Sequence, residues 1–138
     1  MASQLKVDTL TGVTTAGSIV VTGEGNSTTT NLQQGLSKCW CLFNGQGTIA
    51  IRDSFNSSGL TDIGTGIYQV NYSNNTASAN TVTSGSNVGD GATSNRTNGQ
   101  IGAYGSVTTA LTYFTTNYDA NAYADFTHVG ITVAGDLA

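Results

Sequence analysis

The chain of 138 residues contains no proline, little charge and few aromatic side chains. Only 9% of its residues are charged, and four basic against eight acidic residues give a net charge of −4. Disordered chains usually combine high net charge with proline, so we expect a folded protein. The basic residues are scattered, whereas phosphate binding needs clustered Lys and Arg. We therefore expect no nucleic-acid partner.

Long apolar runs are also missing. No stretch of the sequence approaches the ~20 apolar residues that a membrane-spanning helix needs. The N-terminus lacks the charged region and following apolar region of a secretion signal. We expect neither membrane insertion nor a Sec-type leader.

Cysteine and histidine, which hold most metals, are scarce. Cys39 and Cys41 are the two cysteines, and His128 is the one histidine. On a strand the two cysteine Cα atoms lie about 6.6 Å apart, near the outer limit for a disulfide, with the side chains poorly aimed at each other. We expect buried free thiols, and no metal or other cofactor.

Catalytic candidates are few and weak. His128 is the sole histidine available as a general base, and Asp119 with Asp125 is the nearest thing to a carboxylate pair. Residues 117–121 carry oxygen ligands at alternate positions, as a calcium loop does, but Ala122 replaces the turn glycine and His128 the closing glutamate. We expect a turn here and no enzymatic activity.

Threonine, serine, asparagine and glycine make up nearly half of the chain, which favours strands and turns over helices. The fold is therefore predicted to be all-β. Residues 1–36 contain no aromatic side chain and are predicted to form an anchoring or intertwining arm, because they cannot make a core alone. The apolar residues expected to contact a partner are Leu5, Val7, Leu10, Val13, Ile19, Val21, Leu32 and Leu36.

Residues 28–36 predict one helical turn. Asn31 can cap it, Leu32 and Leu36 fall on one face, and Gly35 can end it.

Residues 37–138 predict an antiparallel β-sandwich head domain, jelly-roll-like in kind. Its first strand is apolar on both faces, so it needs the core on one side and another layer, such as a second subunit, on the other. The residues assigned to the core and inter-subunit layer are Cys39, Trp40, Cys41, Leu42 and Phe43. After a turn at residues 44–47, we expect Ile49, Ile51 and Phe55 to share one face of the returning strand.

Further strands are predicted at residues 67–72, 101–116 and 123–133. In the last, the odd-numbered residues share one face. Residues 73–100 predict a long exposed excursion with a short strand at 81–83. Most of the six tyrosines are expected in the core, whereas a row of Tyr and Trp exposed on one face would indicate a sugar-binding platform.

The residues also carry a resemblance. Residues 5–25 and 28–36 resemble the N-terminal segment of tail-fibre and related virion proteins of marine tailed bacteriophages, including cyanophages. Residues 40–56, with the strand IRDSFN, and residues 64–72 are similar to the same family. The resemblance covers about residues 5–72.

This resemblance implies a trimeric β-rich module on a virion, with the N-terminal segment as anchor and the C-terminal domain outward. We expect a non-enzymatic short tail fibre, a homotrimer on the exterior of the phage particle. Its partners would be tail, baseplate or capsid proteins and a host surface glycan. The alternatives are a capsid decoration or head-fibre protein, and a small carbohydrate-binding module.

Overall fold

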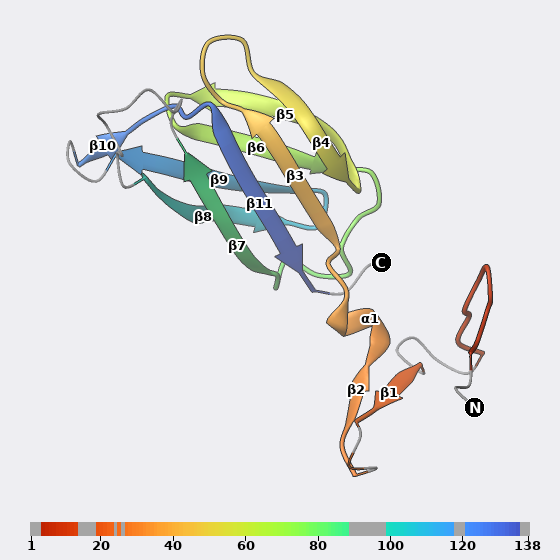
Figure 1. Cartoon of the computed structure of the whole chain (residues 1–138). Coiled ribbons are helices and arrows are strands. Elements are labelled where there is room, and N and C mark those ends of the chain that lie inside the picture. The colour runs from red at the N-terminus through yellow and green to blue at the C-terminus, as the bar shows by residue number, and fades with distance from the viewer. Residues whose placement is uncertain are drawn as a thin grey trace. The chain divides into compact units, whose positions relative to one another are not determined.

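The computed structural model describes residues 4–13, 19–23, 25, 27–88, 99–117 and 121–135. The chain divides into two compact units, Met1–Leu36 and Ser37–Ala138 (Figure 1). Within the described ranges, no helix has the length and apolar character needed to cross a membrane.

The first unit contains a small hairpin and one helical turn. Strands β1 (Val20–Thr22) and β2 (Thr29–Asn31) pair antiparallel, and α1 (Leu32–Gly35) follows directly. The Gln34 backbone N–H donates to the side-chain oxygen of Asn31 over 3.1 Å, which caps the turn. The predicted helical turn and its cap are confirmed, but the turn is shorter than expected because residues 29–31 are in a strand.

The second unit consists of two antiparallel sheets, which Figure 1 shows as a front and a back layer. The four-stranded sheet has the order β4-β3-β11-β7, with the bounds Ala50–Phe55, Cys39–Asn44, His128–Ala134 and Val82–Val88. The five-stranded sheet has the order β10-β9-β6-β5, and β8 also pairs with β9. Its strands are β10 (Ala122–Tyr123), β9 (Ala110–Asn117), β6 (Ile67–Tyr72), β5 (Ser57–Gly64) and β8 (Gly99–Val107).

A shared core lies between the two sheets, because alternate residues of each strand point inward. The four-stranded sheet contributes Phe43 and the valines of β11, while the five-stranded sheet contributes Tyr68 and Tyr113. The Phe43 ring lies edge-on to Tyr68 at 5.1 Å and tilted to Tyr113 at 5.8 Å. The predicted all-β, antiparallel architecture is confirmed, and it is consistent with a β-sandwich.

The turn between β3 and β4 follows from its asparagine and glycines. The Asn44 side-chain amide donates to the carbonyl oxygens of Gln46 and Thr48 over 2.8 and 3.2 Å. Gly47 has a φ of 66°, which glycine adopts without strain. A Cβ atom at Gly45 would lie 2.5 Å from the hydroxyl oxygen of Tyr68, so the core ring needs glycine there.

Two predicted strands are each divided in the structure. The run 101–116 is a hairpin of β8 and β9 around the two residues Thr108 and Thr109. These β-branched residues suit a strand, so the sequence contains no turn signal there. The run 123–133 splits into β10 and β11, with residues 124–127 between them.

The excursion predicted at residues 73–100 contains a full strand. β7 pairs with β11 along seven residues, where only a strand at 81–83 was expected. Its small polar residues resemble a loop in sequence. Glycine is needed at position 85 of this strand, because a Cβ atom there would lie only 2.8 Å from the Ile101 side chain of β8. Residues 89–98 lie outside the described ranges.

The prediction that Ile51 and Phe55 share a face of β4 is wrong. A register shift after Leu42 sets Phe43 opposite Ile51, while Trp40 stays opposite Phe55. This β-bulge adds one residue to β4, so Ile51 lies on the same side as Phe43, although it stays 36% exposed on the edge strand, and Phe55 lies on the same side as Trp40.

Candidate interaction surface

The outer face of the four-stranded sheet carries large apolar side chains. On β3, Cys39, Cys41 and Phe43 point into the core and are almost completely buried. Trp40 and Leu42 therefore point outward. In this single chain Trp40 is half-buried and Leu42 is 37% exposed.

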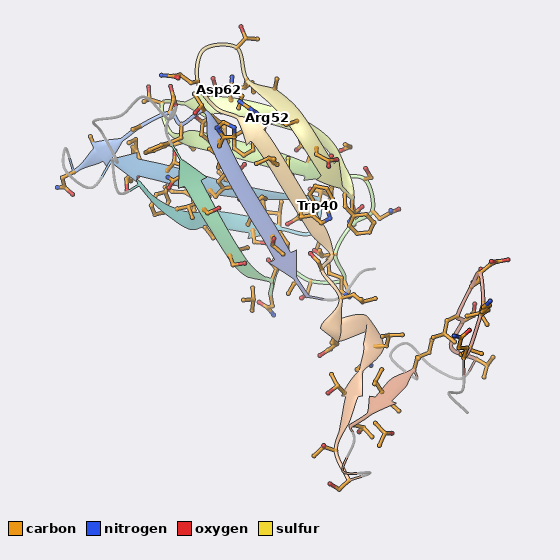
Figure 2. The ribbon with its side chains drawn as sticks, viewed as in Figure 1. Trp40, Arg52 and Asp62 are labelled. Carbon is orange, nitrogen blue, oxygen red and sulfur yellow. The ribbon has the colours of Figure 1, made fainter. Side chains whose placement is uncertain are left out.

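Phe55 extends this apolar surface to the edge strand. It lies directly opposite Trp40 in the ladder between β3 and β4, and its side chain is 51% exposed. Directly opposite residues have Cβ atoms about 5 Å apart, so the two aromatic side chains are neighbours. We call Trp40, Leu42 and Phe55 the apolar ridge. Figure 2 shows Trp40 near one end of this sheet and Arg52 near the other.

A shallow groove of about 450 Å³ lies beside the ridge, over β11 and β7. The ladder sets Thr132 next to Trp40 and Ser84, and sets Gly130 next to Leu42 and Ser86. The groove forms because the residues beside Trp40 and Leu42 on β11 and β7 are small. Trp40 and Leu42 line one side of it, and the small residues are Ser84, Ser86, Gly130 and Thr132. None of the residues that line it is charged.

The outer face of the five-stranded sheet differs in chemistry. Its central strands turn Gln69, Asn71 and Thr112 outward, opposite to the buried Tyr68, Val70, Leu111 and Tyr113. Its aromatic Phe114 lies over Gly102 of the neighbouring strand, where a Cβ atom would approach the ring to 2.6 Å. The four-stranded face thus carries three contiguous apolar side chains, while the five-stranded face has polar central residues and, beside them, the ring pair of Phe114 and Tyr123 with centroids 5.9 Å apart.

The predicted contact residues of the first unit are not buried by their own chain. Ile19 and Leu32 are half-buried, and the six others are exposed, up to 92% for Val13. The exposed ones are Leu5, Val7, Leu10, Val13, Val21 and Leu36.

The two thiols are free and buried, as predicted. Burial, and next the neighbouring Cys41, raise the pKa of Cys39 to about 12. Burial likewise raises the pKa of Cys41 to about 11, although the Ser57 hydroxyl acts in the opposite direction. Both cysteines therefore act as small apolar groups of the core at neutral pH.

The polar candidates are held in structural contacts. His128 is exposed on β11, on the opposite face from Val129 as expected, and its Nε2 accepts from the Arg52 guanidinium over 2.9 Å. One Asp125 carboxylate oxygen accepts from the Gly66 N–H over 2.7 Å and from the Tyr68 hydroxyl over 2.6 Å. Asp119 and most of the calcium-like loop lie outside the described residues, and the described part holds no cluster of metal-ligating residues.

The tyrosines divide between the core and the five-stranded sheet. Tyr68, Tyr72 and Tyr113 are buried, which agrees with the expected core role. Tyr104 on β8 and Tyr123 on β10 are exposed, while Tyr118 is outside the described ranges. The described exposed tyrosines are thus on a different sheet from Trp40, so they form no common row with it.

Sequence reasoning identified Trp40 and Leu42 but missed Phe55 and the groove. The bulge that sets Ile51 and Phe55 on different faces leaves no mark in the residue pattern. The groove depends on which small residues of β11 and β7 come to lie beside β3, and the pairing of strands so distant in sequence was not predicted.

Comparison with known proteins adds no relative. The chain matches no protein-family model, no curated protein and no solved structure. The function is therefore inferred from the surface itself, and the resemblance of residues 5–72 to phage fibre proteins stays a prediction.

Proposed function

We propose that this protein is a non-enzymatic structural subunit of a phage virion. It forms a short homotrimeric tail fibre in which residues 1–36 attach or intertwine and residues 37–138 form a jelly-roll-like head domain that contacts the host surface. The observation that carries the proposal is the amount of apolar surface that one chain leaves uncovered in both units.

The first unit supports self-association most directly. Its eight predicted contact residues include none that is buried, and no aromatic side chain is present to build a core. Units of this size rarely supply enough buried surface for independent stability. Contact with other copies or with another virion protein would bury these side chains.

The apolar ridge supports the same conclusion in the second unit. Single exposed apolar residues are ordinary, but contiguous ones mark interaction sites. Trp40, Leu42 and Phe55 are contiguous on one sheet face, where the edge strand β4 also places Asp53 opposite Leu42.

The strand order supports a jelly-roll-like topology. The first strand of the second unit, β3, lies beside its last strand, β11, as in Greek-key arrangements. The chain also passes from one sheet to the other between β4 and β5 through Asn56. This residue has a φ of 56°, and its side chain donates to the carbonyl oxygens of Lys38 and Asn74.

The location on the virion rests on the resemblance of residues 5–72, and a capsid decoration or head-fibre protein differs only in location. Electron microscopy of intact phage particles, decorated with gold-labelled antibody against the second unit, tests it. We expect label on the tail. Label on the head would replace the tail assignment, and particles without label would contradict a virion role.

A small carbohydrate-binding module is the remaining alternative, favoured by the position of Trp40 beside serine and threonine hydroxyls. A glycan array separates the two. Glycan binding that is lost in Trp40→Ala, by a protein that remains monomeric, would favour the module over the fibre.

A further inference from the structure

We infer that the apolar ridge of one copy packs into the groove of the next, and that this contact, repeated around a threefold axis, closes the trimer. The inference rests on the proposed self-association and deepens it, because it names the surface through which the copies meet. Its elements are the ridge on β3 and β4 and the groove over β11 and β7, on one sheet face.

The position of the two features favours a head-to-tail contact. The ridge extends from β3 to the edge strand β4, and the groove extends from Trp40 and Leu42 over β11 to the other edge strand, β7. A surface that carries apolar side chains toward one edge and a hollow toward the other can join copies in one rotational sense. Such heterologous contacts form closed rings when the rotation allows it.

A second copy fits the groove better than a sugar does. Small-molecule sites are concave pockets that bury most of the ligand's surface, whereas this groove is shallow. The groove offers only the hydroxyls of Ser84, Ser86 and Thr132 and has no carboxylate, amide or guanidinium in its lining. A ligand in the groove would also leave Phe55 uncovered, whereas a protein partner that spans the face covers both.

The lack of charge agrees with a protein interface. The central part of protein interfaces is poor in charged residues and rich in aromatic ones. The ridge contributes Trp40 and Phe55, and the lining of the groove is uncharged throughout. Asp53 lies opposite Leu42 beside the ridge, and the uncharged groove of another copy sets no like charge against it.

The available area sets a limit on this contact. A four-stranded face of six-residue strands measures about 20 Å by 20 Å, on the order of 400 Å². A stable interface buries about 800 Å² on each partner. The sheet face alone would make a small interface, so we expect the exposed apolar side chains of the first unit to add contact area between copies.

The test fills the groove without disturbing the fold. A Cβ atom at Gly130 would make only ordinary contacts, 3.7 Å to the Ser86 hydroxyl and 3.9 Å to the Leu42 side chain. Gly130→Leu therefore projects a side chain into the groove. The matched control is Gly105→Leu, on β8 of the other sheet, where a Cβ atom has no neighbour within 4 Å. The full chain is weighed by native mass spectrometry and light scattering at micromolar concentration.

We expect the wild type and Gly105→Leu to be trimers and Gly130→Leu to be a folded monomer, with its association weakened by at least about 100-fold. A wild-type trimer that Gly130→Leu leaves intact would overturn the ridge-in-groove contact and leave the proposed fibre standing. A wild-type dimer would replace the ring with a twofold contact. A wild-type monomer would overturn both proposals.

A second pair of variants covers the case in which Gly130→Leu fails to fold. Phe55→Ala removes a half-exposed side chain from an edge strand, and Tyr104→Ala removes a 66% exposed one from the other sheet. We expect Phe55→Ala to weaken the trimer and Tyr104→Ala to leave it unchanged. Equal effects of the two would also refute the contact.

Discussion

The same chemical change at two tyrosines of one ring cluster should have different effects on stability. Tyr68 and Tyr113 are both fully buried, with ring centroids 6.2 Å apart. The Tyr68 hydroxyl oxygen lies 2.6 Å from an Asp125 carboxylate oxygen and 2.8 Å from the Gly45 carbonyl oxygen. The Tyr113 hydroxyl has no hydrogen-bond partner. Tyr→Phe removes one oxygen at either position and leaves the ring.

The magnitudes follow from these partners. A hydrogen bond to a charged group contributes about 1.5–3 kcal/mol, so Tyr68→Phe should lower the free energy of unfolding by about that amount. A buried polar group without a partner costs about 1–3 kcal/mol, so Tyr113→Phe should be neutral or stabilise the protein by about 1 kcal/mol after the small void is allowed for. Burial, and next the contact with Asp125, raise the pKa of Tyr68, so its hydroxyl keeps the proton it donates.

Urea unfolding followed by circular dichroism measures both effects. The protomer concentration must be the same for all variants, because association shifts the apparent stability. A Tyr113→Phe variant that loses as much stability as Tyr68→Phe would refute the reasoning, since the hydroxyl bonded to Asp125 would then matter no more than the unpaired one.

Two further predictions concern the core and the turns. The pKa values of Cys39 and Cys41 are raised above the ordinary value of 9, so their contribution to stability is complete below about pH 9 and is lost as the pH rises toward 11 to 12. The urea midpoint should fall over this range, and it should fall less steeply in the double variant Cys39→Ala/Cys41→Ala. Gly66→Ala should cost more than about 3 kcal/mol, because φ is +65° and its Cβ would lie 2.5 Å from a carbonyl oxygen of β9, whereas Gly47→Ala, at φ +66° with no neighbour within 4 Å, should cost about 1 kcal/mol. Equal losses in the two glycine variants would contradict the close packing at Gly66.

Local patterns in the sequence predicted the elements that depend on local physics. The alternation of Cys39, Cys41 and Phe43 with Trp40 and Leu42 is a period-two signal, and β3 has that pattern of burial. The turn that follows and the capped turn at Asn31 were predicted for the same reason, since their hydrogen bonds join residues close in sequence.

The remaining features depend on contacts between distant residues. β7 has the composition of a loop and is a strand because β11 offers it a full ladder of partners. Whether Ile51 and Phe55 share a face depends on a bulge that forms only when β4 pairs with β3. The groove needs Gly130 and Ser86 side by side, although they are far apart in the chain. No pattern within a short window contains these pairings.

The central claim is that copies of this chain cover the apolar side chains of residues 1–36 and the outer face of the four-stranded sheet. The most direct test is the native mass of the full chain at micromolar concentration. A homotrimer predicts three times the 14.1 kDa of one chain. A mass of 14.1 kDa would show that a single copy leaves these side chains in water, which contradicts the claim.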